Sequence, residues 1–256
     1  MRQDERAVFD QALERARLAA YAPGEFVGQE SFMPASEILS LADEAGIAPG
    51  VSVLDLCCGV AGPGRFITRE LGCSYLGVDL SASAIEIARG RAADLTCSFE
   101  VSRIPPVPAG PFDVVILLET MLAFPDKDNL LRHISAALTS GGRFAFTMEE
   151  GQPLTYAERE SMPDSDTVCL VPLAEMLSSL ERVGLRVRWQ QDCSQSHRAI
   201  ADSLIDSFST EASAIAAQVG PVALDELLAA HRLWSGWLLE GRVRKFALVA
   251  EKTPVA

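Results

Sequence analysis

The sequence predicts an α/β protein with a doubly wound sheet of seven mostly parallel strands, and three features lead to this prediction. Short apolar runs rich in β-branched residues alternate with segments of helical period across residues 51–148. The first run, residues 51–56, ends at a turn of small residues that leads into an apparent helix from about Arg65. Two further strand-like runs, at 185–190 and 244–251, flank a helical stretch. Regular alternation of this kind implies parallel strands with helices on both faces.

Each strand is predicted from its own pattern. The run at 112–118 (F-D-V-V-I-L-L) is apolar throughout, which is typical of a central strand buried on both faces. The strand at 143–148 follows Gly141-Gly142, which is expected to end the preceding helix. The seven strands are expected at residues 51–56, 74–80, 97–101, 112–118, 143–148, 185–190 and 244–251.

The helices are predicted from apolar residues at helical spacing and from turn residues between them. The polar, proline-containing stretch 151–166 is expected to be an irregular lid or loop, and Gly220-Pro221 is expected to break the last helical region. The helices are expected at residues 1–20, 34–45, 65 onward, 81–92, 126–138, 173–183 and across 197–239.

The composition narrows the possible functions. The formal charge is −13 with no block of lysine or arginine, so a nucleic-acid partner is not expected. No apolar stretch approaches the roughly 20 residues of a membrane helix, and the first residues lack the apolar core of a signal peptide. We therefore expect a cytoplasmic protein that does not bind a membrane.

The cysteines carry no metal or disulfide signature. Six are present, without C-x-x-C spacing or paired histidines, so neither a zinc site nor a disulfide framework is predicted. We expect small, buried, reduced side chains and no metal site.

The turn after the first strand is the most informative motif. Asp55-Leu56-Cys57-Cys58-Gly59-Val60-Ala61 resembles the D/E-x-G-x-G-x-G loop of class I S-adenosylmethionine (SAM) methyltransferases. Cys57 and Ala61 replace two glycines of that loop by other small residues, and Gly62-Pro63-Gly64 extends it. The resemblance implies a Rossmann-like fold, SAM as cofactor and S-adenosylhomocysteine (SAH) as product.

The position of Asp79 also favours SAM as the cofactor. It ends the second strand, 20 residues after Gly59, where a carboxylate can accept hydrogen bonds from both hydroxyls of a ribose. The dinucleotide fingerprint G-x-G-x-x-G is absent, and Asp55 would repel a pyrophosphate. The same carboxylate favours the ammonium and the sulfonium of SAM, so SAM is preferred over NAD.

Later residues extend the resemblance. Val101-Ser102-Arg103 falls where the family contacts adenine, often through an acid, and Glu119-Thr120 falls beside the methionine part of SAM. Glu119 to Leu122 reads E-T-M-L, so the N/D-P-P-Y signature of nucleobase amino-methyltransferases is absent. The subgroup it resembles most is the small-molecule methyltransferases of type 11. The expected cofactor-binding residues are Gln29, Asp55, Cys57, Gly59, Asp79, Leu80, Ser102, Arg103 and Glu119.

Methyl transfer requires little catalysis by side chains, because SAM is already activated and alignment in a dry pocket supplies much of the rate acceleration. A general base is needed only for a protonated or weakly acidic acceptor. The expected candidates are His231, His197 and Glu149, with Tyr21 and Glu150 as further options.

Each histidine also has a structural interpretation. His231 has apolar neighbours at helical spacing and fits a core histidine, and His197 fits a helix cap or a surface residue. Trp234 and Trp237 fit either an aromatic acceptor pocket or the core.

Four segments are expected: a helical leader or lid at 1–50, a SAM-binding core at 51–195, a helical cap insertion at 196–241 and the last strand of the core sheet at 242–256. The leader either covers the ligand site or packs on the sheet edge. We expect methylation of O, N or C on a small-molecule acceptor, a metabolite or natural product, by a monomer or homodimer. The alternatives are a non-methylating SAM enzyme such as a cyclase, a SAM-binding scaffold and an NAD-dependent oxidoreductase.

Overall fold

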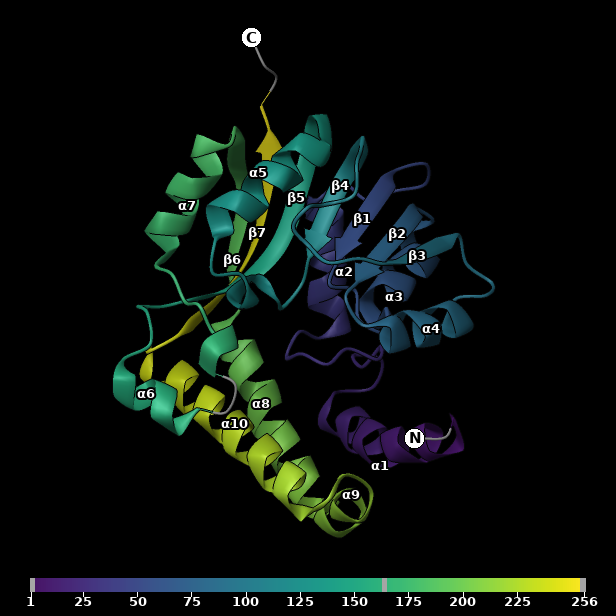
Figure 1. Cartoon of the computed structure of the whole chain (residues 1–256), viewed down its shortest axis with the longest axis vertical. Coiled ribbons are helices and arrows are strands. Elements are labelled where there is room, and N and C mark those ends of the chain that lie inside the picture. Colours follow the sequence, from purple (N-terminus) through teal and green to yellow (C-terminus); the bar gives the residue numbers. More distant parts are fainter. Residues whose placement is uncertain (1–2, 163–164, 254–256) are drawn as a thin grey trace.

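A single seven-stranded sheet forms the centre of the computed structural model, which describes residues 3–162 and 165–253 (Figure 1). The strand order is β3-β2-β1-β4-β5-β7-β6, and β7 runs antiparallel to both of its neighbours while the other pairs are parallel. The predicted fold class is confirmed. The strands are β1 Ser52–Leu56, β2 Ser74–Asp79, β3 Cys97–Val101, β4 Phe112–Leu117, β5 Leu138–Glu150, β6 Leu185–Asp192 and β7 Arg244–Lys252.

Helices cover both faces of the sheet because its central strands are buried on both sides. One apolar cluster joins α2, α3 and α4 to one face, and a second joins α5 and α7 to the other. These helices are α2 Ala35–Glu44, α3 Gly62–Leu71, α4 Ala82–Arg91, α5 Lys127–Ala137 and α7 Leu173–Arg182. The carboxyl ends of the parallel strands therefore meet at one edge of the sheet.

A separate group of helices lies at that edge, and we call it the cap. Its apolar cluster brings the leader helix α1 against α8, α9 and α10 through residues such as Ala16, Phe208 and Leu228. The first part of the leader thus packs on the cap, and α2 packs on the sheet (Figure 1). The leader helix is α1 Gln3–Ala20, and the cap helices are α8 Ser194–Thr210, α9 Ala212–Val219 and α10 Pro221–Glu240.

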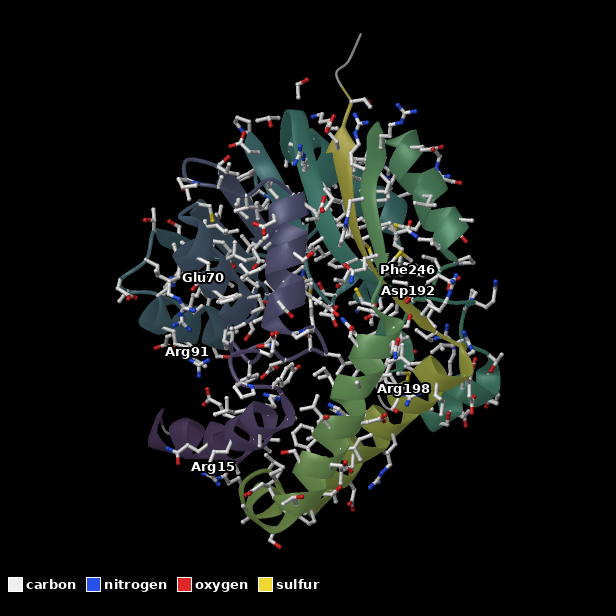
Figure 2. The ribbon with its side chains drawn as sticks, turned by 180° about the vertical axis from the view of Figure 1, so that it is seen from behind. Arg15, Glu70, Arg91, Asp192, Arg198 and Phe246 are labelled. Carbon is white, nitrogen blue, oxygen red and sulfur yellow. The ribbon has the colours of Figure 1, made fainter. Side chains whose placement is uncertain are left out.

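The cap is continuous with the last two strands. Asp192 of β6 pairs with Phe246 of β7, and α8 begins two residues after Asp192. Figure 2 shows this junction from behind, with Arg198 of α8 directly below it. The predicted break at Gly220-Pro221 lies between α9 and α10.

Two of the boundary predictions are wrong. Helix α3 begins at Gly62 rather than near Arg65, because Pro63 is compatible with the first turn of a helix. Strand β5 begins at Leu138, so Gly141-Gly142 lies inside an irregular strand, where Gly141 adopts a φ of 77°. Met1 and Arg2 of the first predicted helix lie outside the described residues.

The segment 151–166, predicted to be irregular, contains one short helix, α6 Tyr156–Ser161. It forms because Thr155 and Glu158 make a reciprocal capping box at its start. Two 3-10 turns, η1 Met121–Ala123 and η2 Ser165–Thr167, complete the described elements, and residues 163–164 lie outside them.

None of the described helices has both the length and the apolar character needed to cross a membrane.

Candidate active site

The loop after β1 holds an unusual backbone conformation. Cys57, Gly59 and Ala61 have φ angles of 60°, 54° and 58°, in the left-handed region that non-glycine residues rarely adopt. The backbone N–H of Cys58 bonds to the carbonyl oxygen of Val78 at 3.0 Å, which ties the loop to β2. Left-handed residues persist where the surrounding structure enforces them, often at ligand sites.

Asp79 holds this loop in place. Its Oδ2 accepts the N–H of Gly59 at 2.9 Å, and its Oδ1 accepts the N–H of Ser81 at 2.8 Å. A carboxylate oxygen has two lone pairs, so each oxygen keeps one for a ligand. The backbone N–H of Ser102 also bonds to the carbonyl oxygen of Asp79 at 2.9 Å, which brings the predicted adenine-side residue to the same strand end.

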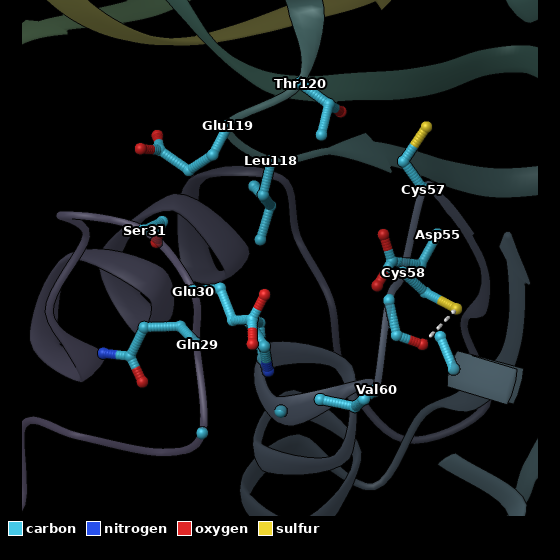
Figure 3. A pocket seen from close by; sticks show the side chains of 15 residues that line it. Gln29, Glu30, Ser31, Asp55, Cys57, Cys58, Val60, Leu118, Glu119 and Thr120 are labelled. Carbon is cyan, nitrogen blue, oxygen red and sulfur yellow. Dashed lines mark hydrogen bonds between the residues drawn. The ribbon is translucent and has the colours of Figure 1, made fainter. Parts of the chain in front are cut away.

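A first cavity of about 300 Å³ opens beside the loop. Figure 3 shows Gln29, Glu30 and Ser31 of the leader on one side and the loop residues around Asp55 on the other. Five of the predicted cofactor residues line it: Gln29, Asp55, Cys57, Gly59 and Glu119.

The other four predicted cofactor residues stand beyond that lining, at the carboxyl ends of β2 and β3. They are Asp79, Leu80, Ser102 and Arg103. Val101 of β3 is the register partner of Asp79 and is 50% exposed, and Leu80 is 56% exposed. An apolar surface therefore adjoins Asp79.

Asp55 is a buried acid at the base of the first cavity. Its Oδ2 accepts a hydrogen bond from the hydroxyl of Tyr75 at 2.5 Å. Burial and, to a lesser extent, the charge of Asp79 raise the pKa of Asp55, the Tyr75 hydrogen bond lowers it, and the net pKa is about 7. A nearby positive charge on a ligand would favour the ionised carboxylate.

The leader closes directly over the loop. A Cβ on Gly62 would come within 2.5 Å of the carbonyl oxygen of Gly28, so only glycine allows this approach. Gln29 is 2% exposed, and its amide bonds to the backbone of Val27, Glu25 and Met33. Gln29 lines the cavity, but its side-chain hydrogen bonds shape the leader.

A second cavity of about 340 Å³ adjoins the first and shares Glu30, Ser31 and Glu119 with it. Its wall is largely apolar, and it extends beneath α10 and the segment around α6. The three predicted catalytic residues, His231, His197 and Glu149, all line this cavity. Trp234 lines it too, whereas Trp237 packs in the apolar cluster behind it.

A buried charge network forms one side of the second cavity. The ammonium of Lys245 lies 2.8 Å from Oε1 of Glu119 and also pairs with Glu149. Burial alone lowers the pKa of Lys245, but the two carboxylates outweigh it and the pKa is raised. Burial raises the pKa of Glu119, but Lys245 outweighs it and the pKa is lowered, whereas burial keeps the pKa of Glu149 raised.

His197 is almost fully buried, at 1% exposure, so neither a surface role nor a simple cap describes it. Its Nε2 lies 2.9 Å from Oε2 of Glu37, and its Nδ1 lies 3.9 Å from Oε2 of Glu119 without a hydrogen-bond partner among the described residues. The Glu37 contact assigns the proton to Nε2, which leaves a lone pair on Nδ1.

His231 is less well placed than His197 to carry a positive charge. Its Nδ1 bonds to the carbonyl oxygen of Leu227 at 2.8 Å, and its ring makes edge contacts with Phe32 and Phe208. Burial lowers its pKa, so it stays neutral and serves as part of the aromatic wall.

Cys193 lies beside Glu37 and His197. Its Sγ, Glu37 and His197 offer three potential metal ligands within 4.8 Å of one another. The 2.9 Å separation of Nε2 and Oε2 is a hydrogen-bond distance, and burial raises the pKa of the Cys193 thiol to about 12. A buried thiol of this kind is a poor ligand until it ionises.

Two residues of this site were not predicted from the sequence. Lys245 could have been found from the sequence, because it lies on the same face of its strand as the apolar residues Ala247 and Val249, which are buried. Glu37 had none, because an acid in the first turn of a helix is common for electrostatic reasons.

The chain resembles known proteins in both sequence and structure. Residues 47–192 match the family model described as "Methyltransferase domain". The methyltransferase GfsG of Streptomyces halstedii is 30% identical over 111 residues, which are 41% of this chain and 40% of that protein. The chain thus spans less than half the length of that curated relative.

Two solved structures share the whole fold. The cyclopropane synthase MmaA2 from Mycobacterium tuberculosis superposes with a TM-score of 0.80 at 13% identity, covering 98% of both chains. The [4+2]-cyclase SpnF superposes with a TM-score of 0.73 at 19% identity, covering 98% of this chain and 95% of that one.

Proposed function

The chain belongs to the methyltransferase domain family of class I SAM-dependent enzymes, and we propose that it transfers a methyl group from SAM to a small-molecule acceptor. The observation that carries the proposal is the pair of adjoining cavities, which share Glu119. The first is lined by the left-handed loop, which Asp79 holds in place. The second is a mostly apolar chamber with buried proton acceptors.

The residues around the first cavity fit SAM by their chemistry. Asp79 has one free lone pair on each oxygen for a ribose diol, and Asp55 and Glu119 are carboxylates suited to an ammonium and a sulfonium. Leu80, Ser102 and Arg103 adjoin Asp79 on the side where the family contacts adenine. When bound, SAM supplies an electrophilic methyl group on a sulfonium.

The second cavity has the features expected of an acceptor site. Its largely apolar wall disfavours water, which strengthens electrostatic interactions inside it, and its shape can hold the reactants in line. We assign His197 as the general base, because Glu37 fixes its Nε2 proton and leaves Nδ1 able to accept one. Glu37 is then a positioning residue that also stabilises the imidazolium formed.

A non-methylating reaction on the same fold is the alternative. The likeness to SpnF, titled a [4+2]-cyclase, makes this alternative concrete, although it concerns the fold alone. The family model and the relative GfsG favour methyl transfer.

A labelling experiment separates the two. The protein is incubated with SAM bearing a trideuterated methyl group and a small-molecule extract, and products are followed by mass spectrometry. Methyl transfer predicts a labelled product and SAH in equal amounts, both lost in Asp79→Asn. An unlabelled product formed without SAH would contradict methyl transfer and favour the cyclase.

A further inference from the structure

We propose that the acceptor is an amine carried on an apolar, ring-bearing body, with its nitrogen directed at Glu119 and Glu149. This inference rests on the proposed function and names the acceptor class for the same site. It comes from the charges, the unpartnered atoms and the wall of the second cavity.

The cavity carries an excess of negative charge. Lys245 is the one lysine or arginine among the described lining residues, and its single ammonium is shared by Glu119 and Glu149. Glu30 is already paired with Arg17 at 2.9 Å. Glu37 adds another carboxylate directly behind His197. A cationic ligand would balance this charge, and an anionic one would be repelled.

Three buried atoms on the cavity lack hydrogen-bond partners among the described residues. Oε1 of Glu119 is one of them, and it lies 2.8 Å from the ammonium of Lys245. The other two are Oε2 of Glu149 and Nδ1 of His197. Unsatisfied buried polar groups are rare in folded proteins, so each calls for an explanation. An ammonium has three N–H donors and can satisfy both atoms at once.

The same charges disfavour a hydroxyl acceptor that must be deprotonated. Removing its proton creates an oxyanion beside the carboxylates of Glu119 and Glu149, where it would be repelled. An ammonium that gives up a proton becomes neutral instead. Phosphate and carboxylate groups on the acceptor are disfavoured for the same reason.

The rest of the cavity suits an apolar body. Phe32, Trp234 and His231 provide aromatic surface, and aromatic faces also attract cations. The aliphatic part of the wall includes Leu122, Val168 and Leu238. This surface fits rings or a hydrocarbon chain attached to the amine.

The proposed step balances in atoms and charge. An R–NH3+ acceptor passes one proton to Nδ1 of His197 and becomes R–NH2. The nitrogen lone pair then forms the new N–C bond to the methyl carbon as the C–S bond of the donor breaks and its electrons stay on sulfur. The products are R–NH2–CH3+ and the neutral thioether of SAH, and His197 returns its proton to solvent.

The test compares amines with isosteres of the same shape. Tryptamine, tryptophol and indole-3-propionate head a library of such triplets, and their affinities are measured by calorimetry with and without saturating SAH. We expect the amine of at least one triplet to bind tenfold or more tightly than its alcohol and acid, and to yield an N-methyl product with SAM. A library in which no amine outbinds its isosteres, including one with no binding at all, overturns the proposal.

Two variants link the preference to the cavity. Glu149→Gln is expected to reduce the amine preference about tenfold, while Glu251→Gln, an acid at the far end of β7, should leave it unchanged. Thermal unfolding checks that both remain folded. Failure of SAH itself to bind would count against the proposed function, whereas normal SAH binding without amine preference would count against the amine alone.

Discussion

The hydroxyl of Tyr75 on β2 donates a 2.5 Å hydrogen bond to Oδ2 of Asp55 on β1, beneath the left-handed loop. Tyr75 occupies the space above Gly64, where a Cβ would come within 2.1 Å of the tyrosine oxygen. The absence of a side chain at Gly64 therefore allows a tyrosine to hold a buried acid at the base of the first cavity.

Asp55→Asn should stabilise the ligand-free protein while weakening SAM binding. The folded-state pKa of Asp55 is about 7, against 3.8 when unperturbed, so the folded state binds a proton more tightly. Its contribution is present below pH 4 and is lost as the pH rises to about 7, by on the order of 4 kcal/mol. Denaturant unfolding at pH 8 should show the variant to be more stable. Equal or lower stability would contradict the assignment.

The pH dependence of SAM binding follows from the same residue. A cationic ligand prefers the ionised carboxylate, so SAM affinity should rise as the pH increases through about 7. This rise should be absent in Asp55→Asn, and calorimetry from about pH 5.5 to about pH 8.5 measures it.

Gly64→Ala should lower SAM affinity and stability together, because the new methyl group displaces Tyr75 from Asp55. Overpacking of this kind typically costs about 1–3 kcal/mol. Gly90→Ala is the matched control: it lies within α4, and its Cβ would meet nothing within 4 Å. That control should be neutral or up to about 1 kcal/mol more stable. Equal effects at the two glycines would contradict the inference that a methyl group at Gly64 displaces Tyr75.

Lys245→Met should destabilise the fold by about 3–5 kcal/mol, since it leaves Glu119 and Glu149 buried without their shared cation. Adding Glu149→Gln removes one stranded charge and should recover at least about 1 kcal/mol. Urea unfolding of the single and double variants measures this coupling. Strictly additive losses would mean that the three groups do not act as a unit.

Glu37→Gln should reduce kcat by about tenfold and His197→Gln by about 100-fold, with SAM affinity unchanged within about twofold. Glutamine can still accept the Nε2 hydrogen bond but no longer stabilises the imidazolium by charge. Single-turnover rates with the acceptor found by labelling separate kcat from binding. His133→Gln, outside the lining of both cavities, is the control. A loss confined to KM would argue against the base assignment.

The elements of the fold that depend on local sequence patterns could be predicted from the sequence. Most strands could be found because they are short apolar runs, and β6 because its apolar and polar residues alternate. The Gly59–Asp79 contact could be anticipated because two adjacent parallel strands bring these residues together. The prediction that Gly141-Gly142 ends a helix is wrong, because β5 pairs with β4 before the glycines as well as after them.

The acceptor side could not be predicted, because it depends on distant pairings. Glu149 meets Lys245 only through the antiparallel register of β5 and β7, and Glu37 meets His197 across 160 residues of chain. The sequence identified His197, His231 and Glu149 separately, and nothing in their spacing indicated that they line one cavity.

The most direct test of the account is a calorimetric titration of SAM into the wild-type protein, Asp79→Asn and the exposed control Glu70→Gln. Losing the ribose contacts should weaken binding to Asp79→Asn at least about tenfold, or 1.4 kcal/mol, and Glu70→Gln should match the wild type. Binding to Asp79→Asn within about twofold of the wild type, or binding of NADH in place of SAM, would contradict the assigned cofactor site.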